Sequence, residues 1–496
     1  MTSNAQHLHP VALLYFLFRD IINMIVPFVV TVIAVANVLP NVPILLLVVI
    51  VTILVLATST IRFFRFTFQL KRDEIVVKHG IFVRHNDHVP YDRIQNITTD
   101  QWFFLKPFGV EKLEIETASH AEKSEVTLFA VPVELKDQLE NLRNQGTTQE
   151  SVPTESATSS GQTESASVDE KNDEQASNTY AITKKDLIKF ALTSPAFLSG
   201  LLVVLAAYGK FEQAISDQMY EYLFKQASHL GILIVILLIV AVLLLFYIGS
   251  VLILINQYYN FKLVEKSNQF ITTKGFFKTK KTTISFKRVQ AVLVKQPLLR
   301  QWLNIATVQL VIISNSKQGD SEKDIIVMPV IIVGKVDSFL NQFFPSIPVQ
   351  KVSPYQPSKW TYYYNLRNAT LLTLANAIIL IALLHFWPWL CVALVIIDIG
   401  FWYVPAILTM KRTKAQVLDE NYLAIRNNRV MTKQLVLIPR ETIQSAEKRQ
   451  SIWLEKKGVA SLTINLRSGT TNRKFNTNYQ LEQDVDAVLN WYKAVN

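Results

Sequence analysis

The sequence is poor in cysteine, glycine and charge. One cysteine, Cys391, occurs in 496 residues, so a single chain holds neither an internal disulfide nor a cysteine-based zinc site. The 14 glycines form no phosphate-binding loop, dinucleotide-binding fingerprint or nucleophile elbow. Charged residues make up 18% of the chain, against about a quarter in a soluble globular protein. The charge is too sparse to cover a soluble surface of this size, and this favours a membrane protein.

What the sequence does contain is apolar surface and positive charge. Half of the residues are hydrophobic, the mean hydropathy is +0.23, the formal net charge is +11 and the pI is about 9.4. A basic chain suits an anionic partner, which means nucleic acid or a membrane surface. The apolar content decides between them, so we expect a lipid bilayer as the partner and no nucleic acid.

Six apolar segments approach the roughly 20 residues that a membrane helix needs. They form three pairs, at residues 21–39 and 42–58, 187–208 and 230–255, and 369–386 and 389–410. Lys and Arg gather outside each pair, and the two tightest turns carry none, so the positive-inside rule places the polar regions and both termini in the cytoplasm. Ala34-Val35-Ala36 resembles a signal-peptide cleavage site, but the preceding positive region is weak and a second apolar segment follows. We therefore expect the first segment to be retained.

Three polar regions, one after each pair, align with one another. Each carries two glutamines six residues apart and a Gly or Asn fourteen residues after the first glutamine. The glutamines are Gln95 and Gln101, Gln290 and Gln296, and Gln444 and Gln450. Around them the apolar residues alternate as in strands, and each region ends with the spacing of an amphipathic helix. We predict a membrane α + β fold of three repeats, each a two-helix transmembrane hairpin followed by a small β module capped by one C-terminal helix.

The predicted boundaries follow the repeat. We expect transmembrane hairpins at residues 11–60, 184–256 and 368–410, and β modules 1, 2 and 3 at residues 61–145, 257–348 and 411–496. A juxtamembrane linker is predicted at residues 349–367. Residues 146–183 are polar without apolar periodicity and are predicted to form a disordered linker.

The motif of each module resembles a known family. A Gly-aromatic turn, a strand ending in Arg93-Ile94-Gln95, a second glutamine and the pair Gly109-Val110 together resemble the bacterial pleckstrin-homology (PH) domains of the YdbS/YdbT-type membrane proteins. The third copy departs from the pattern, with Arg429 where the turn glycine stands in the other two. The resemblance covers nearly the whole chain and fits the three-module, YdbT-like arrangement best. It implies PH-like modules of twisted antiparallel sheets, the cytoplasmic membrane of a bacterium, no assigned enzymatic activity, and a role in envelope stress or antimicrobial-peptide tolerance.

Basic residues are concentrated in module 2. Its net charge is +8 over residues 261–348, against −1 over residues 62–145 of module 1. Six of these residues surround a predicted β-hairpin: Lys274, Lys278, Lys280, Lys281, Lys287 and Arg288. Against a negative leaflet each could contribute about 1 kcal/mol, so one hypothesis is that they bind anionic lipid headgroups. The alternative, which the positive-inside bias favours, is a solvated basic face. Module 1, near neutral, is the candidate for a protein partner such as a smaller membrane protein of the same family.

Three further groups of polar residues have competing interpretations. Asp398 lies near the middle of the sixth apolar segment, where an acid is costly and a functional candidate; we favour packing through a hydrogen bond from Asn376 or Thr373. The repeated glutamines are interpreted as structural, because amides satisfy backbone groups and do no acid–base chemistry at neutral pH. Histidines 79, 85 and 88 have no counterparts in the other modules and are interpreted as surface residues instead of metal ligands.

These observations predict a non-enzymatic membrane scaffold whose cytoplasmic PH-like modules bind anionic lipid headgroups, a protein partner, or both. The rival hypothesis is a transporter or channel with Asp398 on its pathway. A membrane enzyme ranks third, because no paired carboxylates, catalytic triad or metal-ligand motif can be found in the sequence. We therefore expect no catalytic residue, no cofactor and no bound metal.

Overall fold

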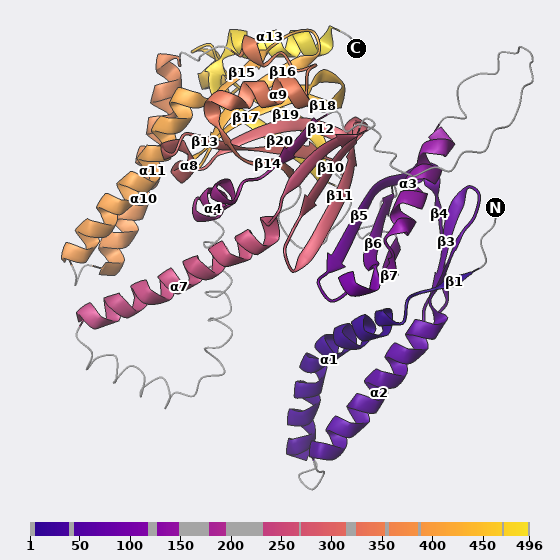
Figure 1. Ribbon diagram of the computed structural model, residues 1–496. Coiled ribbons are helices and arrows are strands. Elements are labelled where there is room, and N and C mark those ends of the chain that lie inside the picture. Colours follow the sequence, from indigo (N-terminus) through magenta and orange to yellow (C-terminus); the bar gives the residue numbers. More distant parts are fainter. Residues whose placement is uncertain are drawn as a thin grey trace, which may run out of the picture. The chain divides into compact units, whose positions relative to one another are not determined.

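A computed structural model describes residues 5–38, 44–117, 126–147, 178–194, 232–266, 269–313, 324–352, 357–384, 388–468 and 471–494 (Figure 1). The chain divides into two compact units. The first consists of Met1–Ser177, Val264–Phe286 and Asn315–Gly319, and the second of Asn178–Leu263, Lys287–Ser314 and Asp320–Asn496.

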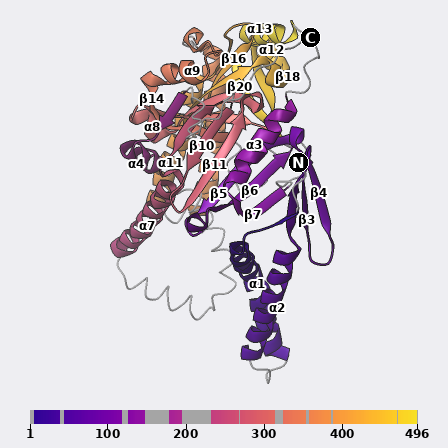
Figure 2. The same cartoon turned by 45° about the vertical axis from the view of Figure 1, so that its right-hand side comes forward.

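Long apolar helices form a hairpin in each unit. In the first unit α1 (Val11–Val38) runs beside α2 (Ile44–Arg65) (Figures 1 and 2). In the second unit α10 (Lys359–Leu384) runs beside α11 (Pro388–Arg412) (Figure 1). The second unit also contains α7 (Ile232–Tyr258) and α4 (Lys184–Leu192); most of the span predicted at residues 187–208 lies outside the described residues. Among the described residues, four helices, α2, α7, α10 and α11, are long and apolar enough to cross a bilayer. Their large side chains point outward, with Leu245 70% and Leu383 72% exposed, as lipid-facing residues do.

Module 1 lies in the first unit and has two antiparallel sheets. The first sheet has the order β1 (Gln6–His7), β2 (Thr67–Leu70), β3 (Glu74–His79) and β4 (His85–Pro90). The second contains β5 (Ile94–Trp102), β6 (Val110–Thr117) and β7 (Val126–Pro132), followed by α3 (Glu134–Thr147). Apolar residues of both sheets and of α3 meet in one core, among them Ile75, Val77, Ile97, Leu113 and Leu139.

Module 3 repeats this plan in the second unit. Strands β15 (Lys414–Val417), β16 (Tyr422–Arg429) and β17 (Thr432–Pro439) make the first set, and β18 (Ile443–Arg449), β19 (Val459–Ser468) and β20 (Thr471–Leu481) form the second sheet. Short α12 (Ile452–Glu455) follows β18, and α13 (Glu482–Lys493) caps the module. Its core joins Leu423 and Ile438 of the first set to Ile464 and Phe475 of the second and to Val485 of α13.

The boundary between the two units runs through module 2. Strands β10 (Gln269–Lys274) and β11 (Lys278–Ser285) belong to the first unit, and β9 (Lys262–Lys266) contains the boundary. The second unit holds β12 (Val289–Gln296), α8 (Leu298–Trp302), β13 (Ile305–Ile312), β14 (Asp324–Ile332) and the capping helix α9 (Val336–Phe343). The predicted fold class, a membrane protein with repeated antiparallel β modules, each capped by a helix, is confirmed.

Strand pairing crosses from one module to the next, which the sequence did not reveal. In the first unit β11 pairs with β5 and places Thr283 opposite Ile97. In the second unit β17 pairs with β12 and places Leu437 opposite Val292. The two junctions have the same register. In both, the residue two positions after the first glutamine of one module faces the residue seven positions before the first glutamine of the next module. Each module is therefore joined to its neighbour by a backbone ladder.

Two elements extend into segments that the sequence predicts to be linkers. Helix α10 begins at Lys359, inside the predicted juxtamembrane linker, because its polar first turns pack on module 3 through Thr361 and Tyr364, which are 1% and 6% exposed. Strand β8 (Asn178–Ala181) lies at the end of the predicted linker 146–183, of which residues 148–177 are outside the described part of the chain.

Candidate membrane interface

Ahead of each module the chain has two described helices, and the first of them packs on the last strand of that module's second sheet. Helix α1 contacts β7, α4 contacts β14 and α10 contacts β20. In module 1 the backbone N–H of His9 donates to the Ala130 carbonyl at 3.2 Å, and in module 3 the Thr361 hydroxyl donates to the Tyr479 carbonyl at 2.6 Å. Ala130 and Tyr479 occupy the same repeat position and both have a positive φ, 49° and 56°. The helix-to-strand contact is thus common to all three modules, and in modules 1 and 3 a hydrogen bond to the left-handed residue adds to it.

The second glutamine of every module closes a loop. Its side-chain amide donates to the backbone carbonyl nine residues later: Gln101 to Val110 at 3.3 Å, Gln296 to Ile305 at 3.2 Å, and Gln450 to Val459 at 3.1 Å. The residue before each carbonyl is left-handed, with φ of 62° at Gly109, 52° at Asn304 and 60° at Gly458, which explains the Gly or Asn at this repeat position. The motif holds together the first two strands of the second sheet.

The first glutamines do not share an environment. Gln290 is 6% exposed, Gln444 is exposed, and the side chain of Gln95 lies outside the described residues. The described part of the chain therefore supports a common structural role for the second glutamine of the pair alone.

The loops closed by the second glutamines are apolar and exposed. We call residues 102–108, 298–303 and 452–454 the apolar loops. Phe103 is 57% exposed, Trp302 80% and Trp453 75%. Single exposed apolar residues are common, but the same loop exposes several of them in all three modules: Trp102, Phe103, Phe104 and Phe108; Leu298, Leu299, Trp302 and Leu303; Ile452 and Trp453. Water would disfavour such surfaces, and the interfacial region of a bilayer would accept them.

Each apolar loop contacts the helix that packs on its module, or a residue next to that helix. The ring of Phe108 is 5.9 Å from that of His9, just before α1. Arg300 donates to the Thr193 hydroxyl at 3.0 Å, and its guanidinium carbon lies 4.6 Å from the ring centroid of Phe190 in α4. The Tyr364 hydroxyl in α10 lies 3.5 Å from the Trp453 carbonyl. The three loops therefore occupy equivalent places at the bases of their hairpins.

In each module the tip of a β-hairpin also exposes apolar residues. Gly80 and Gly275, at φ of 114° and 113°, turn the tips between β3 and β4 and between β10 and β11, where a Cβ atom would lie 1.9 Å from a backbone carbonyl oxygen. Phe82 is 95% exposed, and Phe277 52%. In module 3 the turn is built differently, with Val430 at φ 56° and 63% exposed.

Comparison with known proteins agrees with this repeated architecture. The bacterial PH domain family matches residues 24–146, 202–342 and 369–495, which together make up more than three quarters of the chain. The chain belongs to the bacterial PH domain family. A curated relative, the UPF0699 transmembrane protein YdbT of Bacillus subtilis (strain 168), is 24% identical over 504 residues, covering 99% of each chain. No solved structure matches. The predicted family and its full-length, three-module arrangement are confirmed, and the chain is a membrane protein with three bacterial PH modules.

The six basic residues predicted to bind lipid do not form one cluster. Lys274 lies opposite Lys280, which in turn lies opposite Asp100 of β5. Lys278 forms an ion pair with the same Asp100 at 2.7 Å. Lys281 is on the other face of β11, and Arg288 is only 8% exposed. Lys287 is exposed. Part of the positive charge of this bacterial PH module thus belongs to its junction with module 1.

A buried ionic cluster at that junction was not predicted. Lys136 of α3 is 2% exposed, and its Nζ lies 3.1 Å from the Thr283 hydroxyl and 3.2 Å from Glu140 Oε1. Burial lowers the pKa of Lys136. Burial also raises the pKa of nearby Glu111, which is 6% exposed, to about 7. Residues of two PH modules, Lys136 and Glu140 of α3 and Thr283 of β11, therefore meet in one polar cluster.

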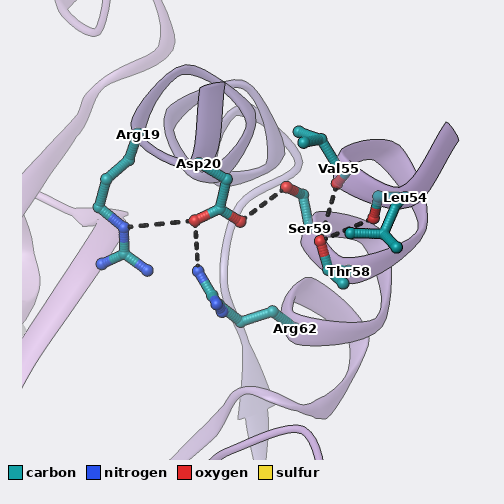
Figure 3. A network of polar contacts seen from close by, with 7 residues as sticks. All are labelled: Arg19, Asp20, Leu54, Val55, Thr58, Ser59 and Arg62. Atoms are coloured by element: carbon teal, nitrogen blue, oxygen red, sulfur yellow. Dashed lines mark hydrogen bonds and ion pairs between the residues drawn. The ribbon is translucent and has the colours of Figure 1, made fainter. Parts of the chain in front are cut away.

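An acid near the base of the first hairpin has a full set of partners. Asp20 of α1 accepts hydrogen bonds from the Ser59 hydroxyl at 2.8 Å and from Arg62 at 2.7 Å, and Arg19 lies 3.8 Å away (Figure 3). Because Ser59 and Arg62 belong to α2, the contacts tie the two helices together. The sequence alone gave no indication of this contact between the two helices.

Asp398 also links the two helices of its hairpin, but through one carboxylate oxygen, while its Oδ2 is buried without a hydrogen-bond partner among the described residues. Its Oδ1 accepts from Asn376 Nδ2 of α10 at 2.9 Å and from Trp402 Nε1 at 3.0 Å. Asn376 is one of the two partners predicted from the sequence.

The three histidines of module 1 contact one another and nearby acids. The rings of His79 and His85 stack with their centroids 5.2 Å apart, His79 contacts Asp87, and His88 contacts Glu74. The described residues contain no group of three or more His, Cys, Asp or Glu placed to hold a metal.

Proposed function

We propose that this protein is a cytoplasmic-membrane scaffold whose three bacterial PH modules rest on the bilayer surface. The observation that supports it is the repeated placement of an exposed apolar loop at the base of a membrane hairpin. Each module is fixed there by a helix-to-strand joint, so its loop stays at the membrane without a separate binding step. A scaffold of this kind acts by concentrating its modules at the lipid headgroups.

Charge at the helix ends supports a cytoplasmic position for the modules and both termini. Helix α2 ends with Arg62 and Arg65 in its last turn, and α11 ends with Lys411 and Arg412. Module strands begin directly after these residues. Under the positive-inside rule, these ends of the helices face the cytoplasm.

Anionic lipid headgroups are the ligand that this proposal assigns to module 2. We assign this role to Lys274, Lys280 and Lys287 by position: Lys274 and Lys280 lie opposite each other on β10 and β11, and Lys287 is exposed. Lys281 lies on the opposite face of β11, and Arg288 is buried. Juxtamembrane lysines attract anionic lipid over about one Debye length, so the binding is expected to weaken with salt.

Native mass spectrometry of the full chain released from nanodiscs tests this assignment. In discs of equal phosphatidylglycerol and phosphatidylcholine, the wild type is expected to retain phosphatidylglycerol preferentially. The combined Lys274→Gln, Lys280→Gln and Lys287→Gln variant is expected to lose most of that preference. The matched control changes three exposed lysines elsewhere, Lys335, Lys474 and Lys493, to Gln. Equal retention by both triple variants would contradict the assignment.

A protein partner and a cellular role complete the proposal. Module 1 is the proposed site for a smaller membrane protein of the same family, and the envelope-stress role is the one that the family resemblance implies. Sensitivity of a deletion strain to cationic antimicrobial peptides, and its rescue by the full chain, tests the cellular role.

A further inference from the structure

Within the described residues, two of the strands at sheet edges, one in each unit, are of the kinds that form the internal junctions. Strand β4 is at the edge of the first sheet of module 1, and β18 is at the edge of the second sheet of module 3. In the repeat, β4 is equivalent to β11 and β17, and β18 is equivalent to β5 and β12. Each junction inside the chain pairs one strand of each kind. Strand β4 in the first module is of one kind and β18 in the last module is of the other, and neither pairs with a described strand of another module.

Burial shows what pairing does to these positions. At the internal junctions, Ile97 and Val292 are 0% and 2% exposed, and their partners Thr283 and Leu437 are 1% and 0% exposed. The equivalent residue of β18, Ala446, is partly exposed, and that of β4, His88, has 54% of its side chain exposed. The end strands present the surface that the internal strands bury.

We propose that β18 of one copy of this chain pairs with β4 of a second copy. The common register of the internal junctions fixes the alignment: Ala446 opposite His88, Glu447 opposite Asp87, and Arg449 opposite His85. The occupant is a second copy because the internal junctions already join the same two kinds of strand twice. Since the two contacting surfaces differ, the contact is head-to-tail and generates a ring or a row of chains in the plane of the membrane.

Charge at the open edges has a counterpart at an internal junction. Asp100, five residues after its first glutamine, is paired across strands with Lys278 at 2.7 Å. Arg449 holds the repeat position of Asp100 in β18 and would lie diagonally across from Asp87, on the other diagonal from the one that joins Asp100 to Lys278. Within its own strand Arg449 already contacts Glu447 at 2.8 Å, so it would also offset the repulsion between Glu447 and Asp87. Charged edges also serve to keep strands unpaired, and the experiment distinguishes the two roles.

Disulfide cross-linking in native membranes tests the proposal. With Cys391 changed to Ala, His88→Cys and Ala446→Cys are placed on two differently tagged full-length chains that are co-expressed and oxidised. The expected product is a dimer carrying both tags, and a ladder of higher oligomers when both cysteines are on one chain. Chains carrying one cysteine each also report whether the variants reach the membrane at the wild-type level.

A register control uses Glu447→Cys in place of Ala446→Cys, which points the thiol to the other face of the strand. We expect at least a fivefold lower yield of the mixed dimer from it. Absence of the mixed dimer, an equal yield from the control, or a cross-link confined to single chains would overturn the proposal. The charges of β4 and β18 would then serve to protect free edges.

Discussion

At the scale of single residues, Gln296 shows how a repeated motif can be structural. Its side chain is 7% exposed and donates to the Ile305 carbonyl. We expect Gln296→Leu to lower the free energy of unfolding by about 1–2 kcal/mol, because a buried carbonyl loses its donor. Hydrogen exchange at the amides of β12 and β13 measures this. Gln444→Leu, at an exposed position of the repeat, is the control and is expected to stay within about 0.5 kcal/mol of the wild type.

Glu111 predicts a pH dependence of stability. Its pKa in the folded chain is about 7, above its ordinary value of 4.5. The folded state therefore binds the proton more tightly, and this stabilisation is fully present below about pH 4.5 and is lost as the pH rises toward 7. At about 1.4 kcal/mol for each pKa unit between the two values, the free energy of unfolding falls by roughly 3 kcal/mol over this pH range. The midpoint temperature of thermal unfolding should decrease between pH 4.5 and 8. Glu111→Gln is expected to remove this decrease, and Glu134→Gln, at an exposed position, is expected to leave it in place.

Residue-level signals are readable in the sequence where they are local. The constant spacing of Gln101, Gln296 and Gln450 is such a signal, because the hydrogen bond that each one makes reaches a carbonyl nine residues later. Lys136 and Glu111 gave no such signal. Their burial depends on β11, and the contact of Lys136 with Thr283 joins residues 147 positions apart. A single sequence contains no spacing rule for such a contact.

At the scale of elements, apolar runs and alternation predicted hairpins, strands and capping helices, because burial and lipid exposure set these patterns. The edge-to-edge junctions were not predictable in the same way. Strands β5 and β11 pair through backbone groups, and polar residues such as Thr98 opposite Thr282 do not differ from those of a solvent-exposed edge. The exposed apolar loops were also missed, since residues 102–108 and 298–303 follow directly on the strands β5 and β12.

Asp398 separates the scaffold from the rival transporter. In Asp398→Asn the amide oxygen can still accept from Asn376 and Trp402, so packing of α10 on α11 is retained. We expect this variant to protect a deletion strain against cationic antimicrobial peptides as well as the wild type does. Asn376→Leu removes the donor and is expected to weaken the hairpin by about 0.5–1.5 kcal/mol. Loss of protection with Asp398→Asn at normal protein level would favour the transporter.

At the scale of the whole molecule, the modules depend on one another. Strand β11 pairs with β5 of module 1, and β12 pairs with β17 of module 3. A fragment of residues 261–348 would lose both partners and expose two edges. We expect that fragment to aggregate or to lack a cooperative unfolding transition, as judged by circular dichroism. A fragment that unfolds cooperatively and stays monomeric would show that the junctions contribute little to stability.

The central claim is that the apolar loops rest in the bilayer surface. Site-directed spin labelling of the full chain in nanodiscs tests it, with Cys391 changed to Ala and one cysteine placed at Leu303 or Ile452, which are 56% and 72% exposed. Labels at Val392 and Lys493 are the references for the apolar span and for the capping helix. We predict that labels at both loops are accessible to oxygen and shielded from a water-soluble nickel complex, as at Val392. Accessibility to the nickel complex equal to that at Lys493 would contradict the account.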